Sequence, residues 1–173
     1  PILHIPKSVL HLPSVTNHTL HFPAQPISDP PTHHLALMAK QSLASGSNPL
    51  KLSFLSTLLS KFPDHKFIVF CSFHAVLNTL QASISNRPVF VISGKVHDKV
   101  HIADAFQATP RAVCLCTFKA ASTAINLSSA HSVVFLGVPW SPATSLQALD
   151  RAHRSGHLGP LDLYLLLDSH LDH

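Results

Sequence analysis

The chain has 173 residues, which is one domain's worth and enough to bury a core. Twelve Lys and Arg residues against eight acidic residues give a net charge of +4, which is compatible with nucleic-acid binding without demanding it. All eight acids are aspartate. Glutamate is the acid most often used beside the metal of a nucleoside triphosphatase, so its absence argues against a self-sufficient catalytic unit.

The cysteines, the histidines and the hydropathy of the chain argue against three further classes of protein: secreted disulfide-rich, metal-binding and membrane-spanning proteins. Cys71, Cys114 and Cys116 lie in apolar, strand-like runs and form no disulfide framework, which favours a reducing compartment over secretion. The fifteen histidines are scattered, and none stands at ligand spacing with a cysteine, so no metal site is predicted. No apolar run approaches the ~20 residues of a membrane span, and no signal-peptide pattern is present.

The first part of the chain differs in composition from the rest. Residues 1–33 contain seven prolines, and such a segment does not hold regular structure for long. We therefore divide the chain into an irregular, Pro- and His-rich arm over residues 1–45 and a folded lobe over residues 46–173. Within the arm, the spacing over residues 34–43 allows a short helix.

From Pro49 onward, short apolar runs alternate with segments of helical spacing. The first helix follows Leu52, Leu55, Leu58 and Leu59 and stops at Pro63. Strands are predicted at residues 67–71, 89–92, 112–117, 132–137 and 161–167, and further helices at 73–83, 96–107, 120–126 and 142–154. This alternation predicts an α/β fold with a mostly parallel sheet of about five to six strands and helices on both faces.

In such a sheet, ligand chemistry gathers at the carboxyl ends of the strands. The five glycines never form a P-loop followed by Lys and Ser or Thr, and no serine lies in a Gly-x-Ser-x-Gly elbow, so neither a nucleotide cradle nor a serine hydrolase is supported. The remaining candidates follow the strands: Ser72 and Phe73, Gly94 and Lys95, Thr117 to Lys119, and Pro139 and Trp140.

The last predicted helix carries the most distinctive pattern. Gln147, Asp150, Arg151 and Arg154 stand at i, i+3, i+4 and i+7, which is one helix face. Two guanidinium groups on one face suit a phosphate better than any other common ligand. The alternative is an exposed ion pair between Asp150 and Arg154, worth a few tenths of a kcal/mol.

In order and spacing, these segments resemble the C-terminal RecA-like lobe of the Swi/Snf-type ATPases of helicase superfamily two, from about Pro49 to Leu167. Pro49-Leu-Lys-Leu52 is similar to the family's opening helix, and Phe67 to Phe73 to its motif IV. Gly94 and Phe106-Gln107 match the segment that follows. Thr117 to Leu127 is similar to motif V, and Pro139-Trp-Ser-Pro-Ala through Gln147 to Gly156 is similar to the family's Trp-Asn-Pro-Ala segment and motif VI. The resemblance implies a RecA-like three-layer fold.

The resemblance also implies roles. Arg151 and Arg154 would be arginine fingers that stabilise charge on a transferring phosphoryl group, oriented by Gln147 and Asp150, with Ala124 of the motif V segment also at the nucleotide. ATP with Mg²⁺ would be held mainly by an N-terminal RecA-like lobe in the parent chain, so this lobe would hydrolyse no ATP and bind no cofactor alone. Five positions would contact the backbone of double-stranded DNA: Ser72, Gly94, Lys95, Thr117 and Lys119. The resemblance further implies that the protein is nuclear if it is eukaryotic and otherwise intracellular, and that it has no membrane partner.

Alternatives stand beside this prediction. The family carries glycines where this chain has Ser122 and Ala124, and asparagine where it has Ser141, which raises the hypothesis of a degenerate, non-catalytic module that binds nucleic acid or protein. Gly94 could be only a turn residue, and Lys95 and Lys119 only solvated charges. Trp140 is interpreted as a packing anchor rather than a base-stacking residue. A flavodoxin-like small-molecule binder is the third hypothesis.

Overall fold

The computed structural model describes residues 14–26, 44–139, 141–154 and 159–169. Its centre is a six-stranded sheet in the order β1-β6-β5-β2-β4-β3, in which every described pair of strands is parallel. The strands are β1 (Val15–Pro23), β2 (Phe67–Cys71), β3 (Val89–Ile92), β4 (Val113–Thr117), β5 (Ser132–Leu136) and β6 (Leu161–Ser169). The helices are α2 (Pro49–Lys61), α3 (His74–Ser83), α4 (Lys99–Ala108), the 3-10 helix η2 (Phe118–Ser122) and α5 (Pro142–Ala152).

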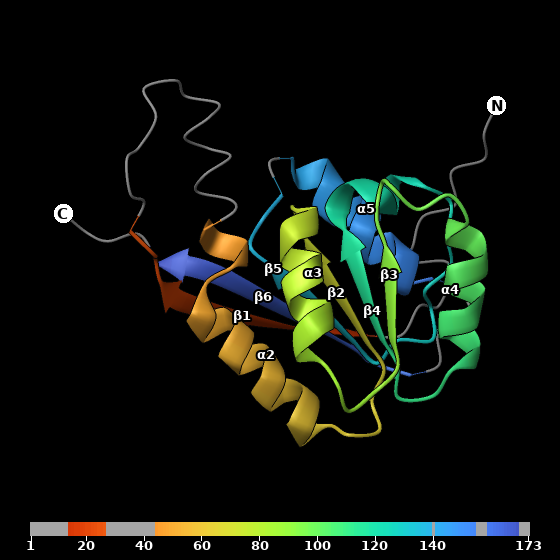
Figure 1. Cartoon of the computed structure of the whole chain (residues 1–173), viewed down its shortest axis with the longest axis horizontal. Coiled ribbons are helices and arrows are strands. Elements are labelled where there is room, and N and C mark those ends of the chain that lie inside the picture. The colour runs from red at the N-terminus through yellow and green to blue at the C-terminus, as the bar shows by residue number, and fades with distance from the viewer. Residues whose placement is uncertain (1–13, 27–43, 140, 155–158, 170–173) are drawn as a thin grey trace.

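Helices cover both faces of the sheet, which gives the expected RecA-like three-layer α/β fold. Figure 1 shows α2 and α3 in front of the strands and α5 behind them. The central strand β2 is buried throughout and alternates between two cores. Ile68 and Phe70 face the core that contains α4, η2 and α5, whereas Phe67, Val69 and Cys71 face the core that contains α2 and α3. A continuous apolar strand such as β2 is what a sheet covered on both faces requires.

The prediction of an irregular arm over residues 1–45 is wrong for part of its length. Residues Val15–Pro23 form strand β1, which pairs with β6 over its whole length, from Val15 opposite Leu161 to Pro23 opposite Ser169. The high proline content of residues 1–33 obscured this strand. The prolines at positions 13 and 23 lie on either side of nine residues that include β-branched and alternating apolar side chains, which is a strand pattern. The folded unit therefore includes this part of the arm. The helix expected at residues 34–43 lies outside the described residues.

Three helix boundaries also differ from expectation. Helix α4 begins at Lys99 because Asp98 caps it, with its carboxylate accepting a hydrogen bond from the His101 amide at 3.2 Å. The segment expected as a helix at residues 120–126 is instead the 3-10 helix η2, and the chain after it is irregular. Helix α5 ends at Ala152, so Arg154 lies beyond the helix rather than on its face.

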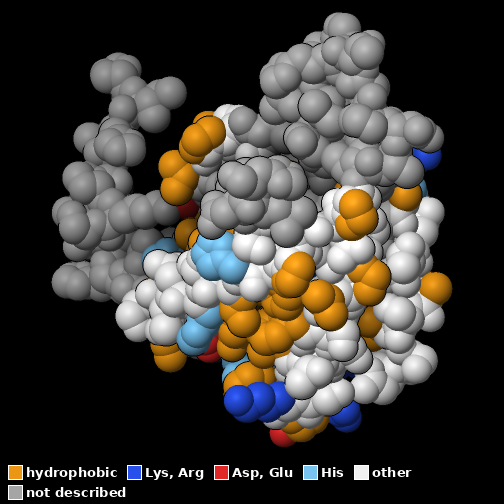
Figure 2. Space-filling view, turned by 90° about the vertical axis from the view of Figure 1, so that its left-hand side faces the viewer, with side chains coloured by type: hydrophobic (Ala, Val, Ile, Leu, Met, Phe, Trp, Pro, Cys, Tyr) orange, Lys and Arg blue, Asp and Glu red, His pale blue; other side chains and the backbone are white. Residues whose placement is uncertain are grey.

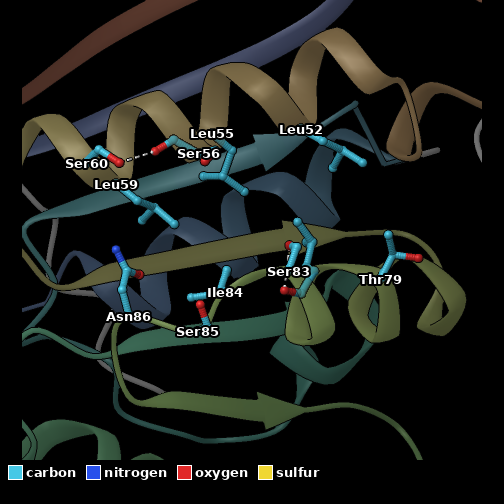
Figure 3. Close-up of a pocket in the computed structure, with 11 residues that line it drawn as sticks. Leu52, Leu55, Ser56, Leu59, Ser60, Thr79, Ser83, Ile84, Ser85 and Asn86 are labelled. Atoms are coloured by element: carbon cyan, nitrogen blue, oxygen red, sulfur yellow. Dashed lines mark hydrogen bonds between the residues drawn. The ribbon is translucent and has the colours of Figure 1, made fainter.

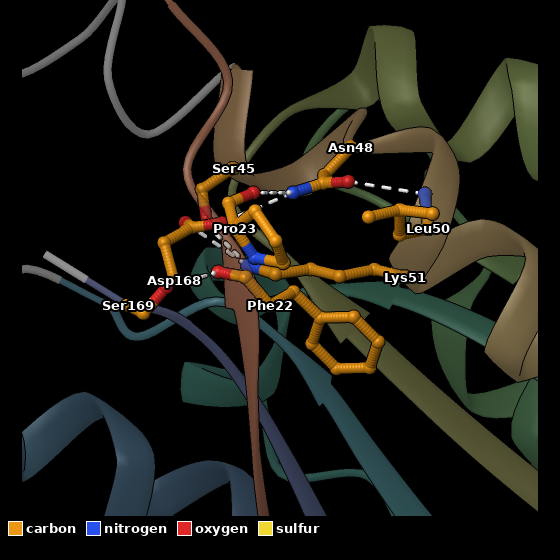
Figure 4. A network of polar contacts seen from close by, with 8 residues as sticks. All are labelled: Phe22, Pro23, Ser45, Asn48, Leu50, Lys51, Asp168 and Ser169. Carbon is orange, nitrogen blue, oxygen red and sulfur yellow. Dashed lines mark hydrogen bonds and ion pairs between the residues drawn. The ribbon is translucent and has the colours of Figure 1, made fainter. Parts of the chain in front are cut away.

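A buried polar cluster joins β1, β6 and the start of α2 (Figure 4). Lys51 is fully buried, and its ammonium group lies 3.0 Å from the Asp168 carboxylate and 2.7 Å from the Ser45 hydroxyl. Asn48 caps α2 through the Leu50 amide and donates from its side chain to the Pro23 carbonyl at 2.9 Å. Burial lowers the pKa of Lys51, and Asp168 opposes this shift.

Two cations hold the opposite, amino-terminal edge of the sheet. The buried Arg87 guanidinium donates to the carbonyls of Leu59, Phe62, Pro63 and His65, at and just after the end of α2. Lys66 donates to the Phe106 carbonyl at 2.6 Å near the end of α4. Both side chains satisfy carbonyls at helix C-termini, where the helix dipole favours positive charge. The contacts at this edge stabilise the fold, and the candidate functional residues lie at the opposite, carboxyl edge of the sheet.

Candidate nucleotide and nucleic-acid site

The carboxyl edge of the sheet holds an open pocket of about 460 Å³. It lies where β2, β4 and β5 end and where α5 begins. Its lining comes from four separate segments: Ser72, Phe73, Phe118, Lys119, Ser122, Pro139, Ser141, Thr144 and Gln147. The structure thus brings together Ser72, Lys119 and Gln147, three of the residues that the sequence singled out. Carboxyl ends of parallel strands are where open α/β sheets bind ligands.

Arg151 connects α5 to the segment that resembles motif V. Its Nε donates to the Ala121 carbonyl of η2 at 2.8 Å, and its own carbonyl accepts from the Leu127 amide at 2.9 Å. The side chain is partly buried. Burial lowers the pKa of the guanidinium, the neighbouring Arg154 charge lowers it further, and Asp150 raises it. An arginine stays protonated through such shifts, so Arg151 is a fixed positive charge held against η2.

The other residues of the predicted arginine face are arranged differently from one another. Gln147 is exposed and lines the pocket. Asp150 is partly buried in the last turn of α5. Arg154 follows the helix cap and folds back, with its Nε donating to the Asp150 main-chain carbonyl at 2.9 Å. A helix face therefore carries Gln147, Asp150 and Arg151 but not Arg154, whose direction is set by this hydrogen bond.

Thr117 and Lys119 occupy different environments although they are two residues apart. Thr117 is 5 % exposed, and its hydroxyl accepts a hydrogen bond from the Ala120 amide at 3.3 Å, which caps η2. Lys119 is exposed in the pocket wall. The Ser122 hydroxyl donates to the Lys119 carbonyl at 2.8 Å. Thr117 thus shapes the turn that presents Lys119 to solvent.

Gly94, Lys95 and Ala124 are exposed and do not line the pocket. A Cβ atom added at Gly94 would meet no atom within 4 Å, so the fold of this chain does not require glycine there. Lys95 stands three residues after the end of β3, at the same edge of the sheet as the pocket. Trp140 lies outside the described residues.

Three pocket residues were not among the candidates from the sequence: Ser122, Ser141 and Thr144. Ser141 and Thr144 stand at the start of α5 and contribute hydroxyl groups to the pocket wall. A signal was present in the sequence, because the residues just before and within the first turn of a helix that follows a parallel strand face the carboxyl edge. The wall combines one cation, several hydroxyl and amide groups and two aromatic side chains.

A second hollow lies elsewhere, between α2 and α3. It measures about 340 Å³, and leucines of α2 form one side while hydroxyl and amide groups line the rim (Figure 3). It contains none of the predicted site residues. Among the described residues, no group of three or more His, Cys, Asp or Glu could hold a metal ion, and no helix is long and apolar enough to cross a membrane. Burial raises the pKa of the Cys71 thiol to about 12, which makes it unreactive.

The order of the strands, the helices on both faces and the pocket at the carboxyl edge define a RecA-like α/β lobe. Residues 50–156, more than half of the sequence, match the family described as helicase conserved C-terminal domain, and the chain belongs to this family. The resemblance to the C-terminal lobe of the Swi/Snf-type ATPases is confirmed by its relatives.

Two curated relatives illustrate this. The chain is 30% identical over 127 residues to helicase SWR1 of Gibberella zeae, with 69% of this chain and 8% of the relative aligned. It is 29% identical over 124 residues to the chromatin-remodeling ATPase INO80 of Kluyveromyces lactis, with 68% of this chain and 8% of the relative aligned. The chain therefore spans less than a tenth of the length of these relatives.

Solved structures agree on the fold. The C-terminal part of the Fun30 ATPase domain aligns with a TM-score of 0.62 at 24% identity, over 72% of this chain and 41% of that one. Domain 2 of the DEAD-box helicase Mss116p, solved with an RNA duplex, aligns with a TM-score of 0.55 at 18% identity, over 68% of this chain and 48% of that one.

Proposed function

We propose that this chain acts as the second RecA-like lobe of a DNA-dependent ATPase of the remodeller or translocase type, working in the nucleus. In this role Arg151 and Arg154 reach toward the phosphates of ATP, which is held with Mg²⁺ mainly by an N-terminal lobe. Gln147, Asp150 and Ala124 lie on the nucleotide side. Closing and opening of the two lobes around ATP then moves the protein along DNA.

The observation that carries the proposal is the attachment of Arg151 to η2. An arginine finger must be held in position before the transition state forms, because it stabilises the transition state through preorganised charge. The hydrogen bond from the Arg151 Nε to the Ala121 carbonyl holds the side chain, and the Leu127 amide holds the Arg151 main-chain carbonyl, both from the segment that resembles motif V. Within the same segment, the 3-10 helix η2 ends at Ser122, which lies in the wall of the pocket.

The DNA strand follows the carboxyl edge in this proposal. Ser72 and Lys119 line the pocket, and Lys95 lies in the open beside β3. These groups donate to phosphate oxygens and carry no sequence information, which suits movement along any duplex. Gly94 allows close approach of the strand to the backbone, and the buried Thr117 contributes by holding η2 in place.

The test is ATP turnover by the two-lobe parent protein, with and without duplex DNA. Arg151→Ala and Arg154→Ala are each expected to abolish most DNA-stimulated turnover. Lys61→Ala is the matched control, because Lys61 is an exposed cation in the last turn of α2 and lies away from the pocket. Turnover that is unchanged in both arginine variants would remove the finger assignment.

The second candidate is a non-catalytic module that binds nucleic acid, and Ser122 favours it. Its side chain stands in the pocket wall at a position where the family carries glycine. The two candidates differ in one observable. A catalytic lobe confers DNA-stimulated ATP turnover on the parent protein, whereas a degenerate one retains duplex binding through Lys95 and Lys119 without any turnover.

A further inference from the structure

Strand β1 is the edge strand of the described sheet, and we call its side that faces away from β6 the open edge. Among the described residues, β1 pairs only with β6. Parallel strands use alternate residues for each neighbour. The Leu161 amide donates to the Ser14 carbonyl, so even-numbered residues of β1 direct their backbone groups to β6. The residues whose backbone N–H and C=O groups point away from β6 are therefore Val15, Asn17, Thr19 and His21.

This open edge has a defined end. Pro23 would be the next outward residue, but it has no N–H group, and its carbonyl already accepts a hydrogen bond from the Asn48 side chain. The outward set thus stops at His21. Asn17, Thr19 and His21 are exposed, and Val15 is partly buried.

The edge lacks the devices that usually prevent strands from pairing between molecules. Natural edges carry charged side chains, bulges or internal prolines. No residue of β1 is Asp, Glu, Lys or Arg, and its one proline is the last residue. Figure 2 views the side toward which β1 and β6 point in Figure 1, where hydrophobic side chains gather in the middle of the face and Lys and Arg side chains lie at its margins.

We propose that two copies of this chain associate through their β1 edges, as antiparallel strands related by a two-fold axis. In the register that places Asn17 opposite Thr19 of the second copy, Val15 stands opposite His21 of that copy. All four outward residues then exchange hydrogen bonds, and Pro23 falls outside the ladder. Such an isologous contact is self-complementary and closes at a dimer.

The side chains of β1 also favour a second copy of the chain as the partner strand. Leu20 and Phe22 are only partly buried in one copy, on the face shared with Phe54 and Tyr164. A second β1 strand alongside would cover more of this apolar surface. A strand without Lys, Arg, Asp or Glu also brings no such like charges together in a copy of itself, which makes the second copy a better occupant than a charged peptide.

The experiment measures the mass of the full 173-residue chain by size-exclusion chromatography with light scattering over a wide range of concentration. We expect the mass to rise from 18.7 kDa to twice that value as concentration increases. Thr19→Pro removes an outward N–H that the β6 ladder does not use, and Thr19→Lys adds charge at the edge. Both should remain monomers. Asn78→Lys adds the same charge on the exposed side of α3 and should dimerise like the unsubstituted chain.

Amide hydrogen exchange gives a second readout that does not depend on a variant folding. In the dimer, the amides of Asn17, Thr19 and His21 should become protected as concentration rises, whereas those of His18 and Leu20 are protected already in the monomer. A chain that stays monomeric at every concentration overturns the proposal. Protected outward amides in a monomer also overturn it, because another segment would then occupy the edge, and so does a Thr19→Pro variant that still dimerises.

Discussion

The buried pair of Lys51 and Asp168 should respond asymmetrically to the loss of either partner. Lys51 is fully buried, whereas the Asp168 side chain is 23% exposed. Lys51→Met leaves a carboxylate that still reaches water and the Asn48 amide, 3.3 Å away. Asp168→Asn leaves an ammonium group with no counter-ion in a buried site, and this loses more free energy of unfolding than Lys51→Met does.

The magnitude follows from the pKa of Lys51. Burial already lowers this pKa from its ordinary value of 10.5, and Asp168 limits the shift. Without Asp168, the free-energy cost of keeping Lys51 charged cannot exceed the free energy needed to deprotonate it, because the side chain would otherwise lose its proton. At pH 7 that limit is about 5 kcal/mol, from 1.36 kcal/mol for each pH unit below 10.5. We expect about 3–5 kcal/mol for Asp168→Asn and about 1–2 kcal/mol for Lys51→Met.

The sign of the pH dependence is fixed by the same reasoning. A lysine with a lowered pKa in the folded state binds fewer protons there than in the unfolded chain, so stability rises with pH between the two values. The deficit of Asp168→Asn relative to the unsubstituted chain should therefore shrink to at most about 2 kcal/mol at pH 9.

Urea unfolding of the full chain, followed by circular dichroism at pH 7 and pH 9, measures these free energies. Asp104→Asn on the exposed side of α4 is the control and should change stability by no more than about 0.5 kcal/mol. Adding Lys51→Met to Asp168→Asn should recover stability, because the double variant has no buried charge. The reasoning is refuted if the two single variants are equally stable, or if the Asp168→Asn deficit is the same at both pH values.

Three further predictions concern other parts of the lobe. Arg87→Met should destabilise the chain by about 2–4 kcal/mol in urea unfolding, because the carbonyls after α2 lose their donors, and a deficit below about 0.5 kcal/mol would contradict this. Lys119→Ala should weaken duplex DNA binding and lower the slope of log affinity against log salt by about 1, whereas an unchanged slope would place Lys119 away from the phosphates. Ser122→Gly should increase DNA-stimulated ATP turnover of the two-lobe protein if the serine obstructs the site, and a decrease would indicate that its hydroxyl is needed.

Much of the fold could be predicted because its signals are local. The apolar runs of β2, β4 and β5 are short and bounded by turns, and all three were predicted within a residue or two of their observed ends. Strand β1 could not be predicted in the same way. Its nine residues are exposed or partly buried, and what makes them a strand is the pairing with β6, in which the partner residues lie 146 positions further along the chain.

The candidate site divides along the same line. Ser72, Lys119 and Gln147 line one pocket at the edge where the sequence placed them, because each stands in or after an element whose type was predicted correctly. The hydrogen bond from Arg151 to Ala121 was beyond prediction, since it depends on how α5 packs on η2. Lys51 was interpreted only as part of a helix, because its partner Asp168 is 117 residues away and nothing local indicates that both are buried together.

The central claim is that Arg151 acts on the transferring phosphoryl group. The most direct measurement is ATP turnover by the two-lobe protein at saturating duplex DNA, comparing Arg151→Lys with the unsubstituted protein. The account predicts that kcat falls by a factor on the order of 10³ while KM for ATP changes little, because a lysine cannot reproduce the planar guanidinium contact in the transition state. A kcat that is unchanged, with or without a higher KM, would contradict it.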